Sequence, residues 1–272
     1  MTSTGSGVAW EDAPAGGPTF KTFGTSSIMI GDATTGTIDA ANYNTGLGVN
    51  VFEDLTTGDN NVAVGFDALI SNTTGSENTG VGRYSLRANT TANYNTAIGT
   101  NSLYGNTTGA NNTALGRSSL ASNTTGSLNV AVGSAALEAN TTGGQNTAVG
   151  SRVLPDNTTG TGNVGMGEAT LFVNTTGDHN VGIGLGALQN SNSDDNVAVG
   201  YRAMHNITSG ANSVAIGSDA LFTATSPSNI VALGVSALRL NTTGENNTAV
   251  GSQALAANTT ATANVAVGHA AG

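Results

Sequence analysis

Two consecutive stretches decide the fold: residues 95–111 read NTAIGTNSLYGNTTGAN and residues 112–128 read NTALGRSSLASNTTGSL. Aligned on their first Asn, they share the pattern Asn-Thr-Ala-aliphatic-Gly, a Leu at the ninth position and Asn-Thr-Thr-Gly from the twelfth. The pattern recurs from residue 27 onward, at intervals of 17 residues except for one of 16. Fourteen full units therefore cover residues 27–263, a partial unit covers 264–272, and residues 1–26 precede the repeat. Self-similarity at a fixed period is the signature of a solenoid.

Each repeat position has a physical interpretation when counted from the first residue of its unit. Position 2 is almost always Thr or Val, position 3 is Ala or Gly in every unit but the first, position 4 is apolar and position 5 is Gly. Such residues predict one short strand per unit. The Asn of position 1 and the Asn-Thr-Thr-Gly of positions 12–15 predict turns, because Asn and Gly tolerate positive φ. The expected fold is all-β, a parallel β-solenoid (β-roll) of 17-residue coils stacked about 4.8 Å apart.

The predicted strand has no polar face. Positions 2 and 4 share one face and the Ala or Gly of position 3 occupies the other. A strand that is apolar on both sides is expected to be buried on both sides. We therefore expect one face to line the interior of its own coil. We expect the Ala/Gly face to contact another copy of the chain, because small residues permit close backbone approach.

Composition and charge argue against several classes of protein. The net charge is −10 and the seven basic residues are scattered along the sequence, so nucleic-acid binding is not expected. No run of 18 apolar residues is present, so we expect no membrane insertion. The chain has no Cys, and its three histidines occupy different repeat positions. We therefore expect no metal, no other cofactor and no catalytic constellation; the chain is not predicted to be an enzyme.

The stretch Asn212-Ser213-Val214-Ala215-Ile216-Gly217 resembles the Asn-Ser-Val-Ala-Ile-Gly motif in the heads of trimeric autotransporter adhesins. The array with its Asn-Thr-Thr-Gly turns also resembles the repeats of phage tail-fibre proteins. The resemblance covers about residues 27–272 and implies a left-handed parallel β-roll, with three chains around one axis.

Two functions follow from the resemblance. The sequence has neither a basic, apolar signal at its start nor a coiled-coil stalk or membrane anchor, which favours a virion component. The leading hypothesis is a structural fibre of a phage or phage-like tail, acting as a spacer or as a host-contact element. The first alternative is a trimeric adhesin head on the bacterial cell surface.

Aromatic residues lie outside the positions expected to form the core. Exposed rings stack on sugars, so a cell-surface glycan is a candidate ligand. The candidate glycan-contact residues are Tyr84, Tyr104, Phe172, Tyr201 and Phe222. Equally, these rings would pad interfaces between subunits. A monomeric glycan- or ice-binding solenoid is the remaining alternative. Ice binding is suggested by the regular Thr columns, but Thr alternates with Val at position 2, which predicts burial.

Residues 1–26 contain Trp10, Phe20 and Phe23 among glycines and prolines, which predicts an extended arm. We expect this arm either to attach the fibre to a larger tail or baseplate assembly or to cap the open edge of the first coil. The repeat continues to Gly272, so we expect that end to point away from the assembly.

Overall fold

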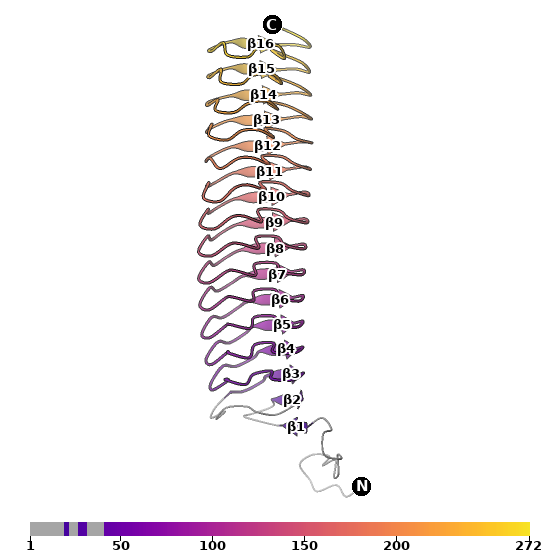
Figure 1. Ribbon diagram of the computed structural model, residues 1–272, viewed down its shortest axis with the longest axis vertical. Coiled ribbons are helices and arrows are strands. Elements are labelled where there is room, and N and C mark those ends of the chain that lie inside the picture. Colours follow the sequence, from indigo (N-terminus) through magenta and orange to yellow (C-terminus); the bar gives the residue numbers. More distant parts are fainter. Residues whose placement is uncertain (1–18, 22–26, 32–40) are drawn as a thin grey trace, which may run out of the picture.

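The computed structural model describes residues 19–21, 27–31 and 41–272, and it confirms the predicted parallel β-solenoid. Its strands lie one above another in a single sheet, with β1 and β16 at opposite ends of the stack (Figure 1). Residues in these described ranges form no α-helix. The strands are β1 (Thr19–Lys21), β2 (Ile28–Gly31), β3 (Thr45–Leu47), β4 (Val62–Val64), β5 (Thr79–Val81), β6 (Thr96–Ile98), β7 (Thr113–Leu115), β8 (Val130–Val132), β9 (Thr147–Val149), β10 (Val164–Met166), β11 (Val181–Ile183), β12 (Val197–Val199), β13 (Val214–Ile216), β14 (Val231–Leu233), β15 (Thr248–Val250) and β16 (Val265–Val267).

The strands pair in parallel and always in the same register. Val62 pairs with Thr79 and Ala63 with Gly80, one repeat further on. The register also holds across the 16-residue unit, where Val181 pairs with Val197. Each repeat position therefore forms a column along the solenoid. Below, coils are named by the number of their first residue, so that coil 95 covers residues 95–111.

One strand departs from the parallel pattern. β1 pairs antiparallel with β2, with Phe20 opposite Ile30, so it covers the edge of β2 that β3 leaves free. An antiparallel strand at this place satisfies backbone groups that would otherwise be unpaired. Of the predicted attachment residues, the backbone of Phe20 lies in β1, whereas Trp10 and Phe23 lie outside the described residues.

The predicted assignment of the two strand faces is wrong. Ala97, in the middle of β6, is fully buried, whereas Ile98 beside it is 40% exposed and Leu115 of β7 is 45% exposed. The Ala/Gly face therefore lines the interior of its own coil, and the face of positions 2 and 4 points outward. The reason is size, because the Leu of position 9 fills most of the thin interior and leaves room for no more than a methyl group at position 3.

Side-chain sizes at positions 3 and 8 are matched across the interior. Position 8 is usually Ala or Ser, and position 3 is usually Ala. Where position 8 carries Val153 or Thr170, position 3 of the next coil is a glycine, Gly165 or Gly182. A Cβ atom at Gly182 would lie 2.5 Å from Cγ2 of Thr170, and one at Gly165 would collide with Cγ1 of Val153. At these two places the glycine is therefore required by packing, whereas Val51 at position 8 is followed by Ala63 in the next coil.

The glycine of position 5 is required by the stacking of successive coils of one chain. Gly116 has a φ of 135°, in a region that side chains rarely adopt. A Cβ atom at Gly116 would lie 2.5 Å from the carbonyl oxygen of Gly133 in the next coil. The crowding at Gly116 thus comes from the next coil of the same chain.

The asparagines of positions 1 and 12 form two buried ladders inside the solenoid. The backbone N–H of Asn112 donates to Oδ1 of Asn95 at 2.9 Å, and Nδ2 of Asn123 donates to Oδ1 of Asn106 at 2.8 Å. Nδ2 of Asn112 and Nδ2 of Asn123 both donate to the carbonyl of Gly126, each at 2.9 Å. Buried amides are stable here because their hydrogen bonds are satisfied.

The predicted origin of the turns is therefore only partly right. The Asn residues of positions 1 and 12 do not have positive φ, and neither do the glycines of position 15. In coil 95, positive φ is found instead at Gly99 (134°), Asn101 (59°), Leu103 (49°) and Asn111 (58°), which occupy positions 5, 7, 9 and 17. Leu103 is fully buried, and the burial of its side chain in the core offsets the energetic cost of its left-handed backbone conformation.

Candidate functional site

The outward face of the sheet is a continuous uncharged strip. In β3–β16, positions 2 and 4 hold only Val, Thr, Leu, Ile and Met. Six of the seven larger side chains at position 4 are 37–49% exposed, and the seventh, Leu233, is half-buried; the six are Leu47, Ile98, Leu115, Met166, Ile183 and Ile216. A monomeric soluble protein rarely exposes an apolar strip of this length. The face is therefore a candidate surface for contact with another chain.

A second surface runs along the edge that follows the strands. All six arginines of the chain occupy positions 6, 7 or 10 of their coils: Arg83, Arg87, Arg117, Arg152, Arg202 and Arg239. The five predicted glycan-contact rings occupy the same three positions. Six of the seven basic residues are therefore not scattered, as their spacing along the sequence suggested, but aligned in space; the seventh, Lys21, lies in β1. We call this surface, made by positions 6, 7 and 10, the arginine–aromatic edge.

The first cluster on this edge is centred on Tyr84. Its ring packs edge-on against Phe66 and Tyr104, with centroid distances of 5.6 and 6.0 Å. The guanidinium of Arg83 lies 4.2 Å from the centroid of Tyr84 and donates a 2.9 Å hydrogen bond to its hydroxyl. Arg87 lies 5.8 Å from the same ring. Distances below about 6 Å are those of cation–π contacts.

The second cluster is centred on Phe222. Arg202 lies 4.3 Å and Arg239 5.8 Å from the centroid of this ring, and His205 packs against it at 5.4 Å. Arg202 also lies 5.3 Å from the ring of Tyr201 and so joins the two predicted rings.

The edge of the second cluster continues into a hollow of about 470 Å³. It is lined by Asp219, Ser236, Arg239, Leu240, Gln253, Ala256 and Ala257. These residues belong to positions 7, 10 and 11 of three successive coils.

The structure thus brings together four of the five predicted rings. Tyr84 contacts Tyr104, and Tyr201 is linked to Phe222 through Arg202. Phe172 stands apart, with Arg152 at 5.6 Å from its ring. Sequence reasoning missed the arginines and His205, and it did not include Phe66 among the candidate glycan-contact residues. The signal that could have found them is their shared repeat positions, which predict contact between neighbouring coils.

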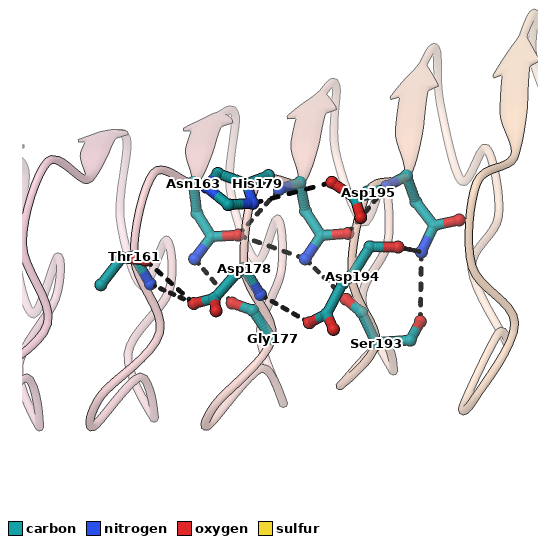
Figure 2. Close-up of polar contacts among 10 residues, drawn as sticks. Thr161, Asn163, Gly177, Asp178, His179, Ser193, Asp194 and Asp195 are labelled. Atoms are coloured by element: carbon teal, nitrogen blue, oxygen red, sulfur yellow. Dashed lines mark hydrogen bonds and ion pairs between the residues drawn. The ribbon is translucent and has the colours of Figure 1, made fainter.

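The opposite edge carries acidic residues whose role is structural. Oδ1 of Asp178 accepts the backbone N–H of Thr161 at 2.6 Å, and Oδ1 of Asp194 accepts that of Asp178 at 2.8 Å (Figure 2). Nδ1 of His179 lies 3.6 Å from Oδ1 of Asp195. Within residues 19–21, 27–31 and 41–272 no three or more His, Asp or Glu side chains are placed to hold a metal ion.

The stacking of coils also explains the Thr residues of position 13 and the Asn-x-Thr triplets, which match the acceptor pattern for N-glycosylation. Oγ1 of Thr107, at position 13, donates to the carbonyl of Thr124 in the next coil at 3.0 Å. Asn106, the first residue of such a triplet, is fully buried and therefore cannot carry a glycan. The Thr residues of position 2 are half-buried or exposed, as at Thr79 and Thr113, and not buried as predicted.

The described part of the chain includes no helix with the length and hydrophobicity needed to cross a bilayer. Comparisons with protein-family models, curated proteins and solved structures find no match, so the two surfaces are interpreted from their own geometry.

Proposed function

We propose that the chain is the shaft of a homotrimeric structural fibre, part of a phage or phage-like tail, which acts as a spacer and host-contact element and not as an enzyme. The observation that carries this proposal is the uncharged outward face of β3–β16. A face that repeats its chemistry at each coil is matched in spacing by the same face of another copy. Burying it removes apolar side chains from water at roughly 25 cal/mol per Å².

Three copies are favoured over two by the resemblance to trimeric β-rolls. The strands are only three residues wide, so each outward face is a narrow strip. Three narrow strips meet around one axis with all chains pointing the same way. This arrangement leaves the arginine–aromatic edge of each chain beside the interface and allows three N-terminal arms to reach one attachment site.

The length of the shaft suits a spacer. Coils contact mainly their neighbours, so rigidity accumulates along the stack. At about 4.8 Å per coil the described repeats span roughly 70 Å.

The test is the mass of the purified protein in solution, together with electron microscopy. We expect a trimer and straight rods. A monomer at micromolar concentration would contradict the proposal. Deletion of residues 1–23 should leave a folded trimer that no longer joins the particle; normal incorporation of the truncated chain would contradict attachment through the arm.

A second candidate is a glycan-binding solenoid that acts as a monomer, and the arginine–aromatic edge favours it. The same mass measurement separates the two candidates, because this one predicts a stable single chain that binds sugar. An adhesin head on a bacterial surface predicts the trimer but places it in the cell-envelope fraction, not in particles released by the cells.

A further inference from the structure

We infer that the arginine–aromatic edge binds an acidic polysaccharide, one whose sugar units carry carboxylates. This inference deepens the host-contact part of the proposed function. It rests on three properties of the edge: its charge relative to the rest of the chain, the repetition of one arrangement at two places, and the hollow beside the second of them.

The placement of charge is selective. The chain carries 17 acidic residues against seven basic ones, so its surface as a whole repels anions. Every arginine nevertheless lies on one edge, and none lies at positions 16 or 17, where Asp59, Asp178 and Asp195 are found. Among the described residues, the edge also carries five carboxylates at the same three positions: Glu53, Asp67, Glu138, Glu168 and Asp219. A polyanion therefore meets an excess of positive charge at the two clusters, where two arginines stand beside one carboxylate, and not along the whole edge.

The two clusters share one arrangement of groups. Each has a central ring, Tyr84 or Phe222, with two guanidinium groups within 6 Å. In each, one arginine is tied to a carboxylate: Nε of Arg87 lies 3.6 Å from Asp67, and Nε of Arg202 lies 3.5 Å from Asp219.

The second arginine of each cluster is available to a ligand. Arg83 and Arg239 are exposed and have no carboxylate partner among the described residues. Each cluster thus has one arginine paired with a carboxylate and another that is exposed beside an aromatic ring, although Arg83 also donates a hydrogen bond to the hydroxyl of Tyr84. A planar guanidinium fork matches a carboxylate in a bidentate way.

The chemistry of these groups fits an acidic sugar better than an isolated anion. The apolar faces of sugar rings stack on exposed aromatic side chains, and the free arginines pair with carboxylates on the same units. The hollow, whose lining includes Arg239, Leu240 and Gln253 as well as the Asp219 that pairs with Arg202, offers room for a sugar unit beside Arg239.

A polymer fits better than a short oligosaccharide. The rings of Tyr84 and Phe222 lie in coils 78 and 213, eight coils and about 40 Å apart. A chain that reaches both clusters binds the second at high effective concentration, so weak contacts add up to a measurable affinity.

The experiment titrates the purified full-length protein with polygalacturonic acid, with neutral dextran and with dextran sulfate. The variants are Arg83→Gln with Arg239→Gln, and the matched control is Arg117→Gln. Arg117 is exposed at position 6, the same position as Arg83, and no aromatic ring of the described residues lies over it. The control therefore removes a positive charge from the same edge without touching a cluster.

We expect the wild type to bind polygalacturonic acid and not dextran. The double variant should bind at least about tenfold more weakly, and the control should change binding by less than about twofold. Arg83→Lys keeps the positive charge but loses the planar guanidinium fork, so its affinity for polygalacturonic acid should lie between those of the wild type and the double variant. Thermal melting of each variant checks that the fold is retained.

Three results would overturn the inference: absence of binding to polygalacturonic acid, binding of dextran sulfate alone, or an equal loss in the Arg117→Gln control. The mass of each sample, measured in parallel, keeps the two proposals apart. A trimer that binds no acidic polysaccharide contradicts this inference only, and a monomer that binds it contradicts only the trimeric fibre.

Discussion

Oδ1 of Asn192 lies 2.9 Å from the backbone nitrogen of Thr175 and accepts its hydrogen bond. In a regular coil the acceptor at this place is a main-chain carbonyl, as where the N–H of Thr158 donates to the carbonyl of Thr175 at 2.8 Å. Asn192 belongs to the unit of 16 residues, and its Oδ1 also accepts the N–H of Thr176 at 3.0 Å. A side-chain amide thus replaces the carbonyl of a regular coil where the unit is one residue short.

Replacing Asn192 by Ala should therefore weaken the solenoid locally. The change removes the acceptor of two backbone N–H groups, each worth about 0.5–1.5 kcal/mol net. Hydrogen exchange at the amides of Thr175 and Thr176 should speed up, while amides a few coils away stay protected. Asn192→Asp keeps an oxygen in place and is the matched control. Unchanged protection of both amides in the Ala variant would show that water replaces the side chain without cost.

Substitution of Gly116 should be severe even for the smallest side chain. Ala at this position combines an unfavourable φ of 135° with a Cβ atom 2.5 Å from a carbonyl oxygen. Overpacking of this kind costs about 1–3 kcal/mol, and Val should cost more than Ala. Gly105→Ala is the control, because Gly105 has no positive φ and its Cβ would approach nothing closer than 3.1 Å. Thermal melting decides: equal melting of the two Ala variants would contradict the requirement for close stacking.

The pair Val153 and Gly165 should show coupled stability. Gly165→Ala alone places a Cβ against Val153 and should destabilise by about 1–3 kcal/mol. Val153→Ala alone leaves a small void and should also destabilise. The double variant reproduces the Ala–Ala combination of Ala136 and Ala148 and should recover most of the loss. Denaturant unfolding of the four proteins gives the interaction energy; additive losses would show that the two side chains do not compete for the same space.

Leu115→Glu should separate the subunits without unfolding them. In a single chain Leu115 is 45% exposed, so a carboxylate there reaches water at little cost. In the proposed trimer three carboxylates would be brought together in an apolar interface, which is unfavourable. Sedimentation should show a monomer, and circular dichroism should show an intact fold. Thr125→Glu, at the exposed position 14, should remain trimeric. A trimer of the Leu115→Glu variant would place the interface elsewhere.

The repeat made most of the fold predictable. The period places every strand from β2 to β16, because residues of the same repeat position must stack. What the residues did not reveal is which strand face is inside. Polarity gives no answer when Val62 faces one way and Ala63 the other; the volume occupied by Leu69 does, and that is known only once the width of the coil is known. For the same reason the Asn columns were predicted as turns, although they are core residues with satisfied amides.

The candidate site was predictable in part. The rings of Tyr84, Tyr104, Tyr201 and Phe222 were identified because they fall outside the core columns. Their arginine partners were missed because the sequence was searched only for clusters of basic residues along the chain. The contact between Arg87 and Asp67 joins two neighbouring coils and does not form such a cluster. Hydrogen bonds of the acidic residues on the other edge run between coils in the same way.

The uniform register between coils has a consequence for the gene. Each coil offers its successor the same backbone edge that it received from its predecessor. Unequal crossing-over between two repeats at the same codon therefore inserts or removes whole rungs and leaves the others intact. The length of the solenoid is therefore inherited in steps of one coil, about 4.8 Å each. The same recombination changes the spacing of the aromatic and arginine side chains along the edge. A single kind of event therefore alters both the length of the solenoid and the pattern of its surface.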